Sequence, residues 1–232
     1  MDELYPDTYQ FIEQQIELYG DELVFDKSSF DYQTDEYAVD NSLQWQSCES
    51  LAALEEQICQ CSKCALHKSR NKFIFGKGNQ DADLMLVGEA PGADEDRLGE
   101  PFVGRAGELL TKMLAAIDIK RDSVYIANIL KCRPPQNRDP LPEEIALCKA
   151  YLIKQIQLIK PKIIVCLGRI ASHALLARSD SLSAMRGQTF DFEATKLVVT
   201  YHPAALLRNT SLKRDAWEDL QRIQRLLINN IQ

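Results

Sequence analysis

The segment GEAPGADED (residues 88–96) is the first part of the sequence whose residue types and spacing suggest chemistry. It follows the apolar run DLMLV (83–87), and glycines with a proline after a buried strand are typical of a loop shaped around a ligand. A phosphate-binding loop would supply a lysine and backbone N–H groups aimed at the anion. This loop instead carries four carboxylates, Glu89, Asp94, Glu95 and Asp96. Because they would repel phosphate, the segment predicts a ligand of another kind.

Four cysteines form a second candidate site. Cys61 and Cys64 have the C-x-x-C spacing that lets one turn wrap around a metal. Cys132 follows a predicted strand and Cys148 lies on a predicted helix, so three segments could supply a tetrahedral zinc site or hold an iron–sulfur cluster. The spacing does not distinguish zinc from iron. Cys148 is also interpretable as a core residue, and Cys59 could compete with Cys61.

Four short apolar runs indicate the elements that must position these residues. The runs cover 84–87, 124–130, 163–167 and 197–200, and successive apolar residues suit strands that are buried on both faces of a parallel sheet. Helical patterns separate the runs. The sequence therefore predicts a three-layer α/β/α domain with a central four-stranded parallel sheet over residues 51–232.

In such a sheet a ligand binds at the carboxyl ends of the strands. The segments that follow the four runs are GEAPGADED (88–96), NILKCRPPQNR (128–138), LGRIAS (167–172) and YHPAALLRN (201–209). We expect all four to converge on one site, although they span more than 100 residues of sequence.

Length and composition limit the kind of protein that this chain can be. The chain has 232 residues and 45% apolar content, which is enough for one sizeable core. It has no long apolar run, and the acidic start MDELYPDTYQ does not resemble a signal peptide, so we expect a cytoplasmic protein without a membrane span. Seven cysteines in that compartment favour metal binding over a disulfide framework.

The net charge of −7 is unevenly distributed along the chain. Residues 1–50 carry a net charge of −12, whereas residues 51–232 carry +5. The first segment is therefore predicted to be an acidic, disordered extension attached to a mildly basic domain. Its weakly amphipathic stretch from Tyr9 to Gly20 is a candidate for binding a protein partner.

Taken together, the motifs resemble family 4 uracil-DNA glycosylases, which carry a four-iron, four-sulfur cluster. The resemblance rests on VGEAPGADED, GEPFVGRAG, NILKCRPPQNR, LGRIA, the pair Arg186-Gly187 and YHPAALLR, in this order between Cys61 and Trp217. It implies the α/β glycosylase fold and the hydrolytic removal of uracil from DNA, which leaves an abasic site for base excision repair. It also implies that the cluster is structural and is ligated by Cys61, Cys64, Cys132 and Cys148.

The resemblance also gives the first loop a ligand, namely an uncharged, planar base extruded from DNA. The residues that would bind it are Gly88, Ala90, Pro91, Gly92, Phe102 and Asn128. Phe102 matches the aromatic residue on which the base stacks. The Asn128 amide offers one donor and one acceptor, which suit uracil O4 and N3–H, and cytosine reverses that pattern.

Three residues are the candidate catalytic groups. His202 would donate a hydrogen bond to uracil O2, where negative charge develops as the bond breaks. Glu89 and Glu95 are the carboxylates that could orient the attacking water, and the sequence does not choose between them. Asp94 and Asp96 are interpreted as solvated loop acids.

The segment from Ala204 to Arg208 is expected to enter the duplex as the base leaves. Leu206 or Leu207 would act as the wedge, and Arg208 would contact a phosphate. Further cationic candidates for the DNA backbone are Lys131, Arg133 and Arg138, each of which could equally belong to an ordinary solvated surface. We expect a monomer acting on uracil-containing DNA, single- or double-stranded.

Two other functions fit parts of the pattern. A catalytically silent DNA-binding module would keep the cysteines and the basic surface, but it would not require Asn128 and His202. A zinc-containing nucleotide hydrolase would need a phosphate-binding lysine or a carboxylate cluster, and the GEAPG loop supplies no lysine.

Overall fold

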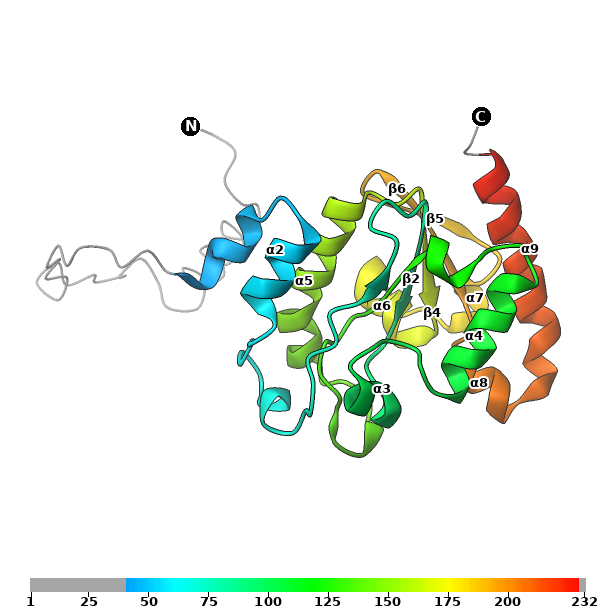
Figure 1. Ribbon diagram of the computed structural model, residues 1–232. Coiled ribbons are helices and arrows are strands. Elements are labelled where there is room, and N and C mark those ends of the chain that lie inside the picture. Colours follow the sequence, from blue (N-terminus) through cyan, green and yellow to red (C-terminus); the bar gives the residue numbers. More distant parts are fainter. Residues whose placement is uncertain (1–40, 230–232) are drawn as a thin grey trace, which may run out of the picture. The chain divides into compact units, whose positions relative to one another are not determined.

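A six-stranded sheet in the order β1-β3-β2-β4-β6-β5 forms the centre of the computed structural model, which describes residues 41–229 (Figure 1). Its four middle strands are parallel neighbours. They are β3 (Tyr125–Asn128), β2 (Leu84–Gly88), β4 (Ile163–Leu167) and β6 (Thr195–Thr200). The predicted four-stranded parallel sheet is therefore confirmed, and each strand lies within or overlaps its apolar run.

Two antiparallel edge strands, β1 (Lys77–Gly78) and β5 (Thr189–Phe192), were not predicted from the sequence. Both residues of β1 are exposed, and β5 is only partly buried. Because neither strand is covered on both faces, neither produces the apolar run that identified the central four.

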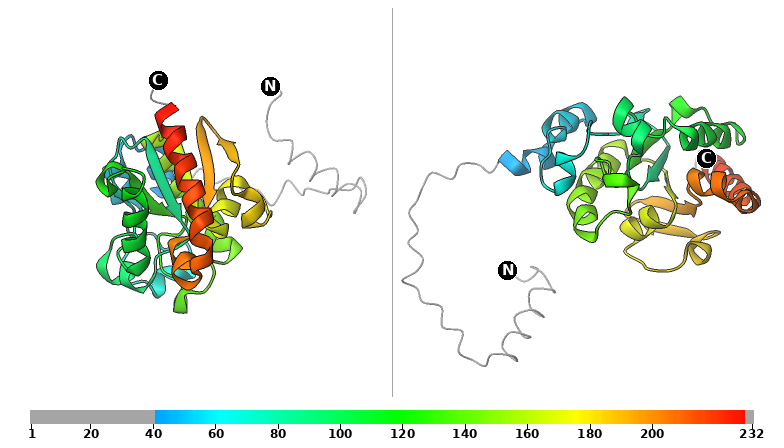
Figure 2. Two further views of the ribbon diagram at one scale, coloured as in Figure 1. Left: turned by 90° about the vertical axis from the view of Figure 1, so that its right-hand side faces the viewer. Right: turned by 90° about the horizontal axis from the view of Figure 1, so that it is seen from below.

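Successive side chains of a central strand point to opposite faces of the sheet, so they pack in two separate hydrophobic cores. In β2, Met85 and Val87 pack in one hydrophobic cluster, whereas Leu84 and Leu86 pack in the other. Helices α2 (Leu51–Ile58), α5 (Pro142–Ile159), α6 (Arg169–Leu176) and α7 (Leu182–Met185) contribute to the first cluster. Helices α4 (Arg105–Ala115), α8 (Pro203–Arg208) and α9 (Lys213–Asn229) contribute to the second. Figures 1 and 2 show helices on both faces of the sheet, which confirms the three-layer arrangement.

The folded body begins upstream of the predicted boundary at residue 51. Trp45 lies in a 3₁₀ helix (Asn41–Ser47) and is only 8% exposed, with its ring 4.9 Å from that of Tyr151. Residues 1–40, which include the amphipathic stretch, lie outside the described residues. The disordered extension, its protein partner and the monomeric state therefore stay predictions.

None of the helices described between residues 41 and 229 is long and apolar enough to cross a lipid bilayer.

Candidate active site and cysteine cavity

A cavity of about 380 Å³ lies at the carboxyl ends of β2, β3 and β6, where the sequence predicts a site. The structure brings ten of the predicted residues into its lining: Glu89, Ala90, Pro91, Gly92, Glu95, Phe102, Asn128, Arg138, His202 and Arg208. The segment LGRIAS after β4 does not line this cavity. Its Gly168 instead supports a wall, because a Cβ there would lie 3.1 Å from the His202 Cβ.

Gly88 lies under the cavity, at the end of β2, and its missing side chain makes room for two lining residues. A Cβ there would lie 2.3 Å from Asn128 Oδ1 and 2.7 Å from Phe102 Cζ. Phe102 has a positive φ of 54°, a conformation that costs a non-glycine residue energy and is common at ligand sites. Gly107 permits this turn, because a Cβ would come within 1.8 Å of the Phe102 carbonyl oxygen.

Asn128 carries an unpaired hydrogen-bond acceptor. The residue is only 3% exposed, and its Oδ1 has no hydrogen-bond partner within the described residues. A buried polar atom without a partner is costly and rare, and it occurs here in a residue that lines the cavity. Asn128 therefore brings an amide group, with one acceptor and two N–H donors, to the cavity wall.

His202 is held in the neutral form with one defined tautomer. Its Nδ1 accepts the Ala204 backbone N–H at 3.1 Å, so the proton of the neutral ring lies on Nε2. Burial, together with the positive charge of Arg208, lowers the pKa of His202 to about 4. Its ring lies 5.4 Å from that of Phe102, tilted by 33°. His202 can therefore act as a neutral hydrogen-bond donor from Nε2.

The two candidate glutamates have different environments. Glu95 Oε2 accepts the Gly92 N–H at 3.1 Å, and its Oε1 accepts the Val103 N–H at 3.3 Å, so this carboxylate joins two loops. The Glu89 side chain makes no hydrogen bond or ion pair with any described residue, and it lines the cavity. Burial raises the pKa of Glu89 to about 7. Glu89 is thus the carboxylate that is free to bind a ligand or water.

Asp139 is a cavity residue that the sequence analysis missed. Its negative charge adds to burial in raising the pKa of Glu89, whereas the nearby Arg169 opposes the increase. Arg169 Nη2 lies 3.4 Å from Asp139 Oδ2. The sequence feature that could have identified Asp139 is its position directly after the NILKCRPPQNR segment, within the loop that follows β3.

The four predicted cysteine ligands surround a second, smaller cavity. Cys61, Cys64, Cys132 and Cys148 all line it. Three sulfur atoms accept hydrogen bonds: Cys132 from Arg70 Nη1 at 3.1 Å, Cys148 from the Lys131 backbone N–H at 3.3 Å, and Cys61 from the Tyr151 hydroxyl at 3.3 Å. Such donors favour thiolates and are typical of metal centres. Yet among residues 41–229 no three ligating side chains converge closely enough for a single metal ion.

A family model described as the uracil DNA glycosylase superfamily matches residues 75–221. The chain belongs to this superfamily. The type-4 uracil-DNA glycosylase of Archaeoglobus fulgidus is 45% identical over 186 residues, which cover 77% of this chain and 94% of that protein. The type-4 uracil-DNA glycosylase of Thermotoga maritima is 44% identical over 178 residues, which cover 75% and 93%. These matches confirm the family to which the motifs pointed.

In this member of the superfamily, several charged and apolar side chains lie where the sequence analysis did not place them. Leu206 is 2% exposed and belongs to the core, so it cannot enter DNA from this position, whereas Leu207 is 38% exposed. Lys131 is fully buried and cannot contact a phosphate. Asp96 is not a solvated acid, because it is 1% exposed and accepts hydrogen bonds from Asn71.

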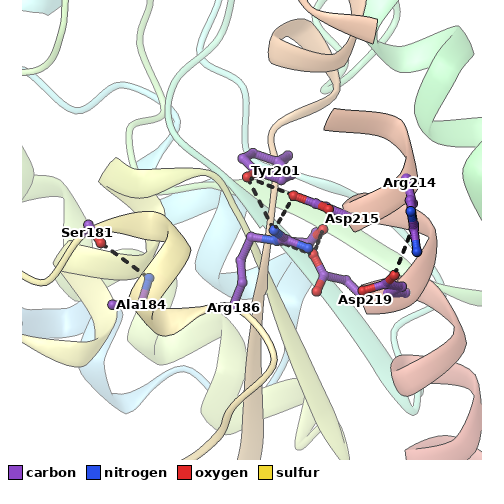
Figure 3. Close-up of polar contacts among 9 residues, drawn as sticks. Ser181, Ala184, Arg186, Tyr201, Arg214, Asp215 and Asp219 are labelled. Carbon is purple, nitrogen blue, oxygen red and sulfur yellow. Dashed lines mark hydrogen bonds and ion pairs between the residues drawn. The ribbon is translucent and has the colours of Figure 1, made fainter. Parts of the chain in front are cut away.

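Arg186, the arginine of the family-like Arg186-Gly187 pair, fixes the strand end that leads to His202. Its Nε donates to Asp219 Oδ2 at 2.7 Å, and its Nη1 donates to the Tyr201 hydroxyl at 3.2 Å (Figure 3). Thr200 also donates to Asp219 Oδ2, at 2.7 Å. The two residues before His202 are therefore tied to one largely buried ion pair between α9 and the segment after α7.

Removing the Asp219 carboxylate should destabilise the fold. Asp219→Ala removes the more buried of the two carboxylates that pair with Arg186, which keeps Asp215 at 3.0 Å, and leaves the buried Thr200 hydroxyl without its acceptor. We expect the free energy of unfolding to fall by about 2 kcal/mol. Urea denaturation monitored by circular dichroism measures this change.

Arg214→Ala is the matched control, because Arg214 and Glu218 pair on the exposed surface of the same helix. Its expected cost is below about 0.5 kcal/mol. Equal midpoints for the two variants would show that the Asp219 network does not hold this region together.

Proposed function

We propose that this chain is a DNA repair enzyme that hydrolyses the N-glycosidic bond of uracil in DNA and leaves an abasic site. The observation that carries the proposal is the buried, unpaired Oδ1 of Asn128 at the wall of a 380 Å³ cavity. The superfamily membership and the names of the type-4 relatives support it. A catalytically silent module is not favoured, because it has no use for this unpaired acceptor.

Base selection follows from the Asn128 amide. Oδ1 accepts a hydrogen bond from uracil N3–H, and the amide N–H donates to O4. Cytosine presents an acceptor at N3 and an amino group at C4, so both contacts would become repulsive. Rejection of a base that leaves buried polar groups unpaired is stronger than rejection by shape alone. Phe102, held against Gly88, supplies the aromatic surface for stacking.

Neutral His202 stabilises the leaving group. When the bond between C1′ and N1 breaks, its electron pair moves to uracil, and negative charge gathers chiefly at O2. The Nε2–H donates to this oxygen without transferring its proton. A donor aimed at charge that exists only in the transition state lowers the barrier more than it tightens substrate binding.

Glu89 completes the reaction as a carboxylate. It orients the water whose oxygen forms the new bond to C1′ and accepts the proton that this water loses, while its negative charge faces the cationic sugar. Glu95 is a positioning residue instead, since both of its oxygens are engaged by backbone N–H groups. Leu207 is the wedge, and Arg208 contacts the DNA backbone.

The cysteine cavity would hold a four-iron, four-sulfur cluster with a structural role. The donor set fits, because four thiols from three segments line one cavity. The names of the type-4 relatives favour the cluster over a single zinc ion, which four thiols could also hold. When bound, the cluster crosslinks the segment before β1, the segment after β3 and helix α5.

Oligonucleotides carrying U, T or C at one site test the function directly. We expect abasic product, detected by alkaline cleavage, from the U strand only. Asn128→Asp should lower uracil release and relax discrimination against cytosine, because a protonated carboxyl can donate to N3 and accept from the amino group. His202→Ala should lower the single-turnover rate by about 10²-fold. Wild-type rates in both variants would show that the cavity is misassigned.

The pH dependence of the single-turnover rate should reflect the ionisation of Glu89. Because its pKa is raised to about 7 and its carboxylate is the active form, the single-turnover rate should rise with pH through about 7 and then level. Glu89→Gln should remove this rise and lower the plateau by about 10²-fold.

Asp139→Asn tests the same assignment without changing Glu89 itself. Removing the negative charge of Asp139 lowers the pKa of Glu89, so the inflection of the rate profile should shift to lower pH. His202, with a pKa near 4, should add no inflection near neutral pH. An unshifted profile in Asp139→Asn would contradict the assignment to Glu89.

Anaerobically purified protein should be brown and contain about four irons per chain. Cys61→Ala, Cys132→Ala and Cys148→Ala should each lower iron content and soluble yield. Cys166→Ala should keep the iron, because Cys166 is buried in β4 and only fills space in the core. One zinc per chain without sulfide would refute the cluster.

A further inference from the structure

An open groove of about 340 Å³ adjoins the candidate active site. Its lining residues are Arg105, Ala106, Ala204, Leu207 and Arg208. Three of them, Ala106, Ala204 and Arg208, also line the larger cavity, so the two spaces are continuous. Ala106 of α4 and Ala204 of α8 contribute only small side chains to this lining. We call this space the Arg105 groove.

The two arginines of this groove have free guanidinium groups. Both are exposed, and neither makes a hydrogen bond or an ion pair with any described residue. Ten other arginines within residues 41–229 have such a partner, as Arg138 does in Glu144. The remaining exception is Arg225, on α9. Two of the three unpaired arginines therefore lie together, beside the cavity.

The surroundings of Arg105 favour an anion. Arg105 is the first residue of α4, where the helix dipole adds partial positive charge. Asp94, which lies beside Gly104, is already paired with Arg97 at 3.3 Å. Glu108, one turn into α4, does not line the groove. The two charged side chains that line the groove, Arg105 and Arg208, are thus both cationic.

We propose that the Arg105 groove binds the phosphates of the DNA strand that carries the extruded nucleotide, with Arg105 and Arg208 each contacting one phosphate. This inference rests on the proposed function, because it places the strand that leads into the cavity. Arg105, which no sequence motif singled out for DNA, becomes a binding residue. Leu207 lines the same groove and is 38% exposed, so the proposed wedge and the two arginines share one surface.

Salt titration of binding to an undamaged duplex tests the groove. Each phosphate contact contributes about −0.9 to the slope of log K against log[salt]. Arg105→Ala and Arg208→Ala should each make the slope shallower by about 0.9, and the double variant by about 1.8. Each single variant should weaken binding roughly tenfold at low salt, as expected for one charged hydrogen bond. Arg105→Lys should restore the slope, because it keeps the charge.

Arg225→Ala is the matched control, since it removes an exposed, unpaired arginine outside both cavities and should change neither affinity nor slope. If Arg105→Ala matches Arg225→Ala while wild-type protein releases uracil, the groove proposal is wrong and the function stands. If wild-type protein releases no uracil, the function fails, and the slopes still decide whether the groove binds phosphate. A slope change in Arg208→Ala alone also overturns the groove, because Arg105 is then not a contact.

Discussion

The close packing above Gly88 is the constraint on which the site depends. Parallel pairing of β2 with β3 sets Gly88 directly beside Asn128. The absence of a side chain then lets Asn128 Oδ1 and the Phe102 ring approach the same backbone atom. Any larger residue at position 88 would displace both groups at once. The fold thereby holds a buried acceptor unpaired and a phenylalanine at positive φ, two local costs that preorganise the cavity for a planar ligand.

Burial in this cavity sets the protonation states that the chemistry requires. The same desolvation lowers the pKa of His202 and raises that of Glu89, because in each case it disfavours the charged form. A neutral histidine retains a donor for a developing anion and does not compete with the cationic sugar. Glu89 titrates near neutral pH, whereas Glu95 accepts two backbone N–H groups. Two carboxylates six residues apart thus have different surroundings, on which the different roles proposed for them rest.

The sequence was sufficient to predict the parts of the fold that depend on local pattern. Apolar runs located the four central strands, and the segments that follow three of them do line one cavity. It could not predict which of two adjacent leucines is exposed, because α8 turns Leu206 into the core and Leu207 away from it. Nor could it show that Arg186 pairs with Asp219, since that contact joins elements 33 residues apart. Edge strands and buried charges depend on residues that are close in the fold but distant in the sequence, and local sequence patterns do not show such contacts.

Lys131 connects the cavity that would bind uracil to the cavity that would bind the cluster. Its ammonium group is fully buried and donates to the carbonyl oxygens of Phe75 and Asn128, both at 3.0 Å, and to Gln155 Oε1 at 2.6 Å. Three acceptors match its three protons, which is the condition for burying such a charge. Its backbone N–H donates to Cys148, and the next residue is Cys132. The stretch from Asn128 to Cys132 is therefore anchored at one end by the sheet and at the other by the thiols. A cluster bound there would need no part in electron transfer to affect catalysis, because it would fix the segment from which the Asn128 amide projects.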